Sequence, residues 1–430
     1  MPETAEHLPL TSYQKLLWGA LQPGCEPTLC NLSQELLLEG DLDSDALRAA
    51  FRQTMSETEA MRTRVMSHNG APCQVVAEAG AGDLAVVDLR SEPAPLSSAR
   101  AQITSDAARS WDLRSEPPVI STLYKVSDKR FVWGSHAHHL LIDGAGMELV
   151  HRRMREIYSD LLRGLTPTDR PPARLRTLIR EEAAYRSSTG YYRDRFFWSN
   201  QLNNFRDPCR LTPLATPNTP LSPARRLQFQ LTSVHSRALR GTARRYGTGW
   251  QAAMVAALAA LVQLTTGTRD SLLNMATSAR SGPAAKRTPG MAANTVPLRL
   301  TIAPGSSLAE LVQQSAIVVK TALRHRRFPV SALFSDTRNA EELGLMQGPY
   351  INIMPSVADR DLPGATVRTS QLYTTRFCND VNLDITLVGD AFSLTLLANP
   401  DSCCDERLGR LADQLVSLLS RLAWRPGSRL

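Results

Sequence analysis

The chain has 430 residues, which is too long for one ordinary hydrophobic core and predicts two domains. Its 43% hydrophobic and 21% charged residues are typical of a soluble globular protein. The net charge of +8 rests on 49 basic residues, of which 49 − 5 = 44 are dispersed arginines without interleaved aromatics. This pattern argues against nucleic-acid binding and favours an acidic protein partner.

Hydropathy and cysteine usage predict a cytoplasmic protein with no membrane contact. The N-terminal stretch "MPETAEHLPLTSYQ" lacks the apolar core of a signal peptide. The longest apolar run, residues 252–262, is too short to cross a bilayer and predicts a buried helix. The seven cysteines form no CxxC pair and no zinc-type spacing, so we expect free thiols and no metal.

In the first half of the chain, three local patterns predict regular elements. Residues 43–55 have the apolar spacing of an amphipathic helix, with an aspartate near the start. Residues 119–126 and 130–138 are alternating segments joined by a tight turn, which predicts a hairpin. Residues 147–162 carry one apolar face and predict a second helix. A proline-rich segment at 165–175 then marks a domain boundary, so we expect domains at 1–172 and 173–430.

The second half mixes helices with strands. A second proline-rich stretch, residues 207–226, predicts a long surface loop. We expect helices at 249–267, 307–326 and 405–424, and strands at 270–279, 294–300, 350–357 and 392–400. Helices mixed with antiparallel strands on both sides of the boundary predict an α+β fold, an α/β sandwich of two similar halves.

Three of the eight histidines lie in one segment, "SHAHHLLIDGAG", between the hairpin and the helix. A loop from a strand end to a helix start is a common place for reactive groups, and the pKa of histidine suits proton transfer near neutrality. His139 is therefore the candidate acid or base, and Asp143 can orient its imidazole or brace the loop. His136 and His138 share one strand face and can equally be core residues. The sequence has no GxSxG nucleophile elbow and no HExxH order for a metal.

The pattern HHxxxDG at residues 138–144 resembles the signature of the condensation-domain superfamily of nonribosomal peptide synthetases and related acyltransferases. Other segments resemble the remaining motifs of that family, in the same order: "PLTSYQKLLW", "TEAMRTRV", "YYRDRFFWSNQL", "ATSAR" with "GMAANTVPLRL", and "RHRRFPVSALF". The resemblance spans nearly the whole chain. It implies two chloramphenicol-acetyltransferase-like subdomains that form a V-shaped pseudo-dimer with a central tunnel.

Carried over by position, the resemblance makes His139 the catalytic histidine, with His138 supporting the loop. It implies that Asp143 pairs with Arg280 of the second half as a structural brace, and that Gly144 leaves room for a thioester. Three further residues follow from the same motifs: the brace Arg62, and Asn294 and Asn352 in the substrate tunnel.

The expected reaction is transfer of an acyl or aminoacyl group from a thioester on the 4'-phosphopantetheine of a carrier protein to a small-molecule amine or alcohol. No bound cofactor is implied. The sequence departs from the family at "SAR", where many relatives have glycine before the arginine, and at Met291 and Ala292, which replace an aromatic pair. The histidines argue against the cyclising branch, and "NTVPLRL" favours the condensing branch over the epimerising one.

Because no adenylation or carrier module is apparent, we expect a free-standing, monomeric condensation enzyme of natural-product biosynthesis. Two alternatives stay open. One is an acyl-CoA-dependent N- or O-acyltransferase of the same fold. The other is a catalytically silent docking platform, which the intact set of His139, Asp143 and Gly144 disfavours.

Overall fold

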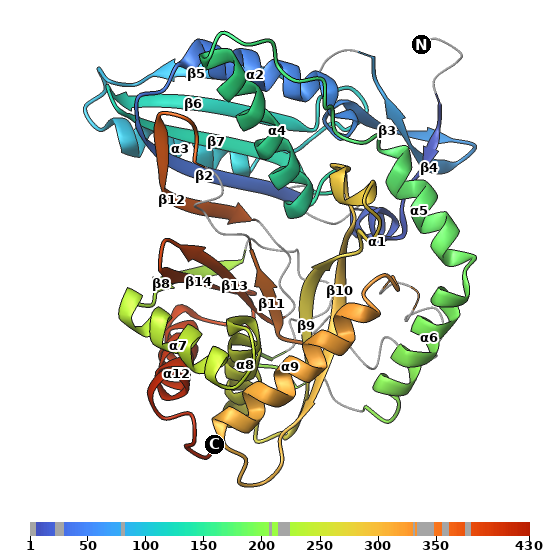
Figure 1. Cartoon of the computed structure of the whole chain (residues 1–430), viewed down its shortest axis with the longest axis vertical. Helices are drawn as coiled ribbons and strands as arrows, with labels where there is room; N and C mark the ends of the chain where they lie inside the picture. Colours follow the sequence, from blue (N-terminus) through green and yellow to red (C-terminus); the bar gives the residue numbers. More distant parts are fainter. Residues whose placement is uncertain are drawn as a thin grey trace. The chain divides into compact units, whose positions relative to one another are not determined.

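The computed structural model describes residues 6–21, 30–78, 82–205, 209–213, 224–329, 332, 348–354, 361–374 and 380–430. The chain forms two compact units (Figure 1). Unit 1 comprises Met1–Ser187, Arg280–Ala293 and Val357–Arg376. Unit 2 comprises Ser188–Ala279, Asn294–Ser356 and Phe377–Leu430.

A five-stranded sheet lies at the centre of unit 1, in the order β12-β2-β7-β6-β5. Neighbouring strands are antiparallel except β5, which runs parallel to β6. The hairpin predicted from the sequence is β6 and β7. The bounds of the strands are β2 (Asn31–Gly40), β5 (Leu84–Asp88), β6 (Val119–Ser127), β7 (Arg130–His138) and β12 (Ala365–Thr374).

Helices cover both faces of this sheet. The helices α2 (Ser44–Glu57) and α4 (Gly144–Leu162) pack against each other on one face, and α3 (Pro95–Ala107) lies on the other (Figure 1). Successive side chains of a strand point to opposite faces, so Leu36 and Leu38 join the core beneath α2 and α4. Leu37 joins the core with α3. The helices predicted at 43–55 and 147–162 are thus confirmed.

A smaller three-stranded sheet, in the order β1-β4-β3, completes unit 1. The helix α1 (Ser12–Ala20) begins with a capping box, in which the side chains of Thr11 and Gln14 bond each other's backbone N–H groups. The remaining elements are β1 (Leu8–Pro9), β3 (Thr63–His68), β4 (Ala71–Val76), the 3-10 turns η2 (Glu59–Arg62) and η3 (Ala285–Arg287), and α5 (Arg176–Arg186).

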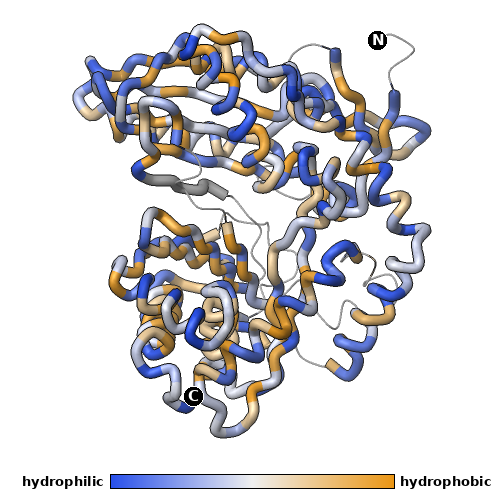
Figure 2. Tube along the Cα trace, viewed as in Figure 1, coloured by the Kyte–Doolittle hydropathy of each residue, from blue (hydrophilic) through white to orange (hydrophobic). Residues whose placement is uncertain are grey.

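Unit 2 contains a six-stranded sheet, in the order β10-β9-β11-β13-β14-β8. The short strand β11 runs parallel to both of its neighbours, β9 and β13. Figure 2 shows mostly hydrophobic residues along the strands that Figure 1 labels β13 and β14. The bounds are β8 (Arg225–Gln230), β9 (Asp270–Ser278), β10 (Ala293–Thr301), β11 (Tyr350–Ile353), β13 (Val381–Val388) and β14 (Ala391–Ala398).

The core of unit 2 is built around one alanine-rich helix, α8 (Trp250–Thr266). Its residues from Ala252 to Val262 are all buried, which confirms the buried helix predicted from this run. The small side chains let α7, α9 and α12 pack closely on it. The helices are α6 (Thr189–Leu202), α7 (Ser233–Arg245), α9 (Leu308–Arg324) and α12 (Asp405–Trp424).

The units differ from the predicted domains 1–172 and 173–430, because the first segment of unit 1 runs on to Ser187 and two later segments return to unit 1. Strand β12 pairs with β2 along its length, and Arg280–Ala293 packs beside the start of α4. Neither pairing has a local sequence signal. The predicted mixed α+β class is correct. The predicted loop at 207–226 lies mostly outside the described residues.

Two further findings concern the thiols and the helices. The described cysteines, Cys30, Cys73, Cys209, Cys403 and Cys404, are free thiols, and Cys25 and Cys378 lie outside the described residues. Among the described helices, no single one is long and apolar enough to cross a membrane. Within the part of the chain that the structure describes, one pair of helices, α7 and α8, bent by 101°, reaches that length and composition together.

Candidate functional site

The histidine loop, which we define as residues 138–146, joins the end of β7 to the start of α4. Strand β7 is hydrogen-bonded to β2 and β6 on its two sides, so its last residue has a fixed position. His136 and His138 on this strand are 1% and 3% exposed, whereas His139, just beyond the strand, is half-buried. The sheet therefore places one imidazole of the cluster at the edge of the core.

His139 is held by its backbone and by its ring. Its N–H donates to the carbonyl of Cys30 at 2.7 Å, and its Nδ1 lies 3.0 Å from the carbonyl oxygen of Ile142. A carbonyl can only accept, so we assign the hydrogen to Nδ1. In that tautomer, Nε2 carries the lone pair that can accept a proton.

His138 and His136 are neutral members of the core. Burial, reinforced by the neighbouring His139, lowers the pKa of His138 to about 4. Burial, together with the charge of Arg109, lowers the pKa of His136 to about 4. The Nδ1 of His138 accepts a hydrogen bond from the N–H of Leu140 at 3.2 Å, which shapes the turn that follows.

Asp143 acts as a brace of the loop. Its Oδ1 accepts from the N–H of Gly146 at 2.6 Å, which caps α4, and its Oδ2 accepts from Arg280 Nη1 at 2.7 Å and from the N–H of Ala292 at 2.8 Å. The carboxylate is 2% exposed. None of its described hydrogen bonds goes to His139. Of the two roles open for Asp143 from the sequence, the geometry supports bracing.

Arg280 joins the segment Arg280–Ala293 to the histidine loop at Asp143. Besides Asp143, its guanidinium donates to the carbonyls of Gly290 at 2.7 Å and Thr288 at 3.2 Å. The N–H of Asp143 in turn donates to Gly290 at 3.2 Å. The Asp143–Arg280 pair expected from the resemblance is therefore present. Arg280 belongs to unit 1, however, so the brace lies within one unit.

The two glycines of the loop have different surroundings. A Cβ on Gly146 would lie 2.7 Å from Ile142 Cγ1 and 2.9 Å from the carbonyl oxygen of Gly290, so this position has no room for a side chain. A Cβ on Gly144 would meet nothing within 4 Å. The space predicted beside Gly144 is thus open with respect to the described atoms.

Two buried glutamines that were not predicted from the sequence support the histidine loop through hydrogen bonds. Gln14 Nε2 donates to the carbonyl of Leu140 at 2.9 Å and to Gln74 Oε1 at 2.7 Å. Both side chains are at most 1% exposed. The available signal was the Thr-x-x-Gln capping box at the start of α1, which predicts a helix but not a long-range partner.

The other predicted residues lie in three separate places. Arg62 donates to the carbonyls of Ala77 and Glu78, which follow β4, and so braces the small sheet of unit 1. Asn294 and Asn352 lie in unit 2.

Asn294 is a structural bracket. Its amide donates to the carbonyls of Arg326 at 2.5 Å and Phe328 at 2.6 Å, and the residue is 1% exposed. Asn352 is half-buried on β11 and donates to Asp384 Oδ1 at 3.2 Å. A tunnel role for either residue stays a prediction.

Comparison with known proteins places this loop in a family. The condensation domain family matches residues 4–430, nearly the whole chain, and the protein belongs to this family. It is therefore an acyltransferase of the amide-bond-forming kind.

The relatives found are peptide synthetases. The chain is 28% identical to the dimodular nonribosomal peptide synthase of Bacillus subtilis (strain 168) over 97% of its own length and 18% of that protein. It is 28% identical to enterobactin synthase component F of Escherichia coli (strain K12) over 98% of its length and 33% of that protein. The chain thus spans a third or less of the length of these relatives.

Two solved structures have the same fold. The first condensation domain of the calcium-dependent antibiotic synthetase, in complex with a substrate analogue, matches with a TM-score of 0.88 and 26% identity, covering 99% of this chain and 98% of that one. The starter condensation domain of rhizomide synthetase, in complex with C8-CoA, matches with a TM-score of 0.86 and 26% identity, covering 98% and 96%.

Proposed function

We propose that the histidine loop catalyses transfer of an acyl or aminoacyl group from a carrier protein's phosphopantetheine thioester to an amine, or less often a hydroxyl, in natural-product biosynthesis. The observation that carries this proposal is the hydrogen bond between His139 Nδ1 and the carbonyl of Ile142, which leaves Nε2 as the basic nitrogen. The carrier protein is the partner, and the pantetheine arm arrives as part of the substrate.

The residues of this chain fit the two demands of the reaction. The attacking amine forms a C–N bond to the thioester carbon while its proton passes to His139 Nε2. As the C–S bond breaks, the imidazolium returns that proton to the leaving thiolate. Such help by a positioned base contributes typically ~10²–10⁴-fold to the rate.

The negative charge of the tetrahedral intermediate needs a donor. The first backbone N–H groups of α4, at Gly144 and Ala145, have no carbonyl within the helix to bond, and the open space at Gly144 adjoins them. We assign the oxyanion to this position. The Asp143–Arg280 brace holds the helix start in place and takes no proton.

The finer features of the resemblance belong to the same proposal. They are the two acetyltransferase-like halves, the V-shaped arrangement with a tunnel, the contribution of Asn352 to its acceptor side, and action as a free-standing monomer. A second donor class is acyl-CoA, which the C8-CoA complex of the similar starter domain favours.

One assay separates the two donors. The purified protein is offered the same acyl group on a carrier protein and on CoA, with a panel of amines, and products are followed by mass spectrometry. We expect product from the carrier-loaded donor. Turnover with CoA alone would overturn the carrier proposal. Product formation that persists in full in His139→Ala would overturn the mechanism, and His235→Ala, at a half-buried histidine on α7, is the matched control.

A further inference from the structure

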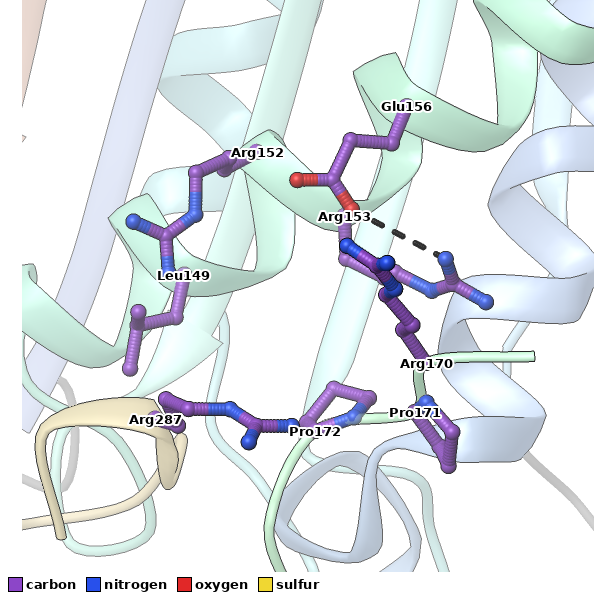
Figure 3. A pocket seen from close by; sticks show the side chains of 8 residues that line it. All are labelled: Leu149, Arg152, Arg153, Glu156, Arg170, Pro171, Pro172 and Arg287. Carbon is purple, nitrogen blue, oxygen red and sulfur yellow. Dashed lines mark ion pairs between the residues drawn. The ribbon is translucent and has the colours of Figure 1, made fainter. Parts of the chain in front are cut away.

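A pocket rich in arginine lies beside α4, entirely within unit 1 (Figure 3). It has a volume of about 610 Å³. Figure 3 shows that its arginines come from three segments: α4, the chain just before the prolines at 171 and 172, and η3. The residues lining it are Leu149, Arg152, Arg153, Glu156, Arg170, Pro171, Pro172 and Arg287.

The charges around this pocket do not balance. Arg153 is 4% exposed and is neutralised by Glu57, whose carboxylate accepts from its Nε at 2.7 Å and its Nη2 at 3.0 Å. Glu156 lies 3.7 Å from Arg153 Nη1 and is the acidic residue among the described residues of the lining. Arg152, Arg170 and Arg287 are exposed, and no acidic partner is found for them among the described residues. Even with Glu156, the arginines leave a net positive charge around the opening, which an anion would neutralise.

The pocket is a fixed feature of the fold. The N–H of Ala173 donates to the carbonyl of Arg287 at 3.1 Å, which ties the proline segment to η3. Arg153 Nη2 donates to the carbonyl of Thr168 at 2.9 Å, which ties the same segment to α4. The three arginines therefore sit on backbone segments that are hydrogen-bonded to one another, so little ordering of the backbone is needed when a ligand binds.

The histidine loop and this pocket share two of their supports. The helix α4 starts at Gly144 in the loop and passes Arg152, an axial rise of roughly 12 Å at 1.5 Å per residue. The segment Arg280–Ala293 supplies Arg280 to Asp143 and Arg287 to the pocket. An extended pantetheine arm is long enough to cover that rise, with its thiol end at His139.

We propose that this pocket binds the phosphate of the donor's phosphopantetheine arm, an inference that rests on the proposed function. Arginine matches phosphate because its planar fork can donate two parallel hydrogen bonds to two oxygens. We take the carrier-borne phosphodiester as the source of the phosphate, in keeping with the proposed carrier donor, and the binding test separates it from CoA.

The test compares three ligands that share the pantetheine arm and differ in the group on its 4'-oxygen. Binding of 4'-phosphopantetheine, pantetheine and CoA to the full chain is measured by calorimetry at low and high salt. We expect phosphopantetheine to bind about tenfold more tightly than pantetheine, which corresponds to one good charged contact. The advantage should shrink as salt screens the charges. CoA that binds much more tightly than phosphopantetheine would overturn the choice of the carrier-borne arm as the source. Equal binding of pantetheine and phosphopantetheine would overturn the proposal.

The double variant Arg152→Gln/Arg287→Gln should remove the advantage of the phosphate, because both residues are exposed and their loss leaves the buried framework intact. The matched control is Arg163→Gln, at an exposed arginine that follows α4 and does not line the pocket. A double variant that binds phosphopantetheine as well as the control does would contradict the assignment.

Kinetics separate this inference from the proposed function. In carrier-dependent transfer, the double variant should raise KM for the loaded carrier about tenfold with little change in kcat. His139→Ala should lower kcat instead. Transfer that depends on His139 but is insensitive to the two arginines would overturn the pocket and leave the function standing. Phosphate-dependent binding without transfer from any donor would support the pocket and overturn the proposed function.

Discussion

The Asp143–Arg280 pair of unit 1 and Asn294 of unit 2 each hold a chain segment through buried polar side chains, but the surroundings of the two segments differ. In unit 1, the Asp143–Arg280 pair fixes a loop that carries the half-buried imidazole of His139 and also Gly144, where an added Cβ would meet no described atom within 4 Å. In unit 2, Asn294 fixes the segment at Arg326 and Phe328.

The ring of His325, the residue before Arg326, is engaged differently from the ring of His139. His325 Nδ1 lies 2.8 Å from Asp194 Oδ1, and its ring stacks on Phe197 at 3.8 Å between centroids. Its carbonyl accepts from Trp198 Nε1 at 3.1 Å. Buried polar groups alone therefore do not identify a reactive site. The loop of unit 1 differs because it carries both a ring held by a backbone carbonyl and a glycine with open space around it.

The largest effect on folding is expected at the charged brace. Arg280→Ala leaves the carboxylate of Asp143 buried without its cation, and we expect a loss of about 3–5 kcal/mol in the free energy of unfolding. Urea denaturation measures it. Arg90→Ala, which removes an exposed ion pair, is the control and should change little. If the two variants lose the same stability, the Asp143–Arg280 pair is no brace.

Acid should weaken unit 1 through its buried histidines. The pKa of His138 is about 4 in the folded protein and near 6.5 when unfolded, so the unfolded state takes up the proton first as pH falls. The stability is complete above about pH 6.5 and is lost toward pH 4, by about 3 kcal/mol for each such histidine.

This dependence has an opposing contribution in unit 2. Burial raises the pKa of Asp380 to about 6, so its protonation favours the folded state between about pH 6 and pH 4. Urea titrations of wild type and His138→Asn from pH 7 to pH 4 isolate the histidine. The variant should show the shallower loss on acidification, and an unchanged slope would contradict the burial of a neutral ring.

The uncharged bracket should matter less than the charged brace. Asn294→Ala leaves two backbone carbonyls without their donor, and we expect a loss of about 2 kcal/mol. Thermal and urea unfolding measure it. A loss as large as that of Arg280→Ala would remove the distinction between a charged and a neutral support.

The smallest effect separates the two glycines of the loop. Gly146→Ala forces a Cβ against Ile142 and the backbone of Gly290, at a cost of about 1.5 kcal/mol. Gly144→Ala should leave the unfolding temperature unchanged and act on substrate binding alone, because its Cβ would meet no described atom within 4 Å. A lower unfolding temperature in Gly144→Ala would show that the space at this position is not open.

The sequence predicted what local patterns encode. Alternation and 3.6-residue spacing located β6, β7, α2 and α4, and the HHxxxDG pattern placed His139 and its brace. Long-range pairings carry no such pattern. Strand β2 pairs with β12, more than 300 positions away, and Gln14 reaches Leu140 through a tertiary contact. The arginine pocket was equally hidden, because its charges come from separate segments of a chain with arginines throughout.

The most direct test of the account is single-turnover acyl transfer from a loaded carrier by His139→Ala, with its stability measured beside wild type. We predict a rate lower by ~10²–10⁴-fold with an unchanged free energy of unfolding, because the ring is half-buried and its loss leaves the Asp143–Arg280 brace intact. A variant that is equally stable and transfers at the wild-type rate would contradict the assignment of His139 as the proton acceptor.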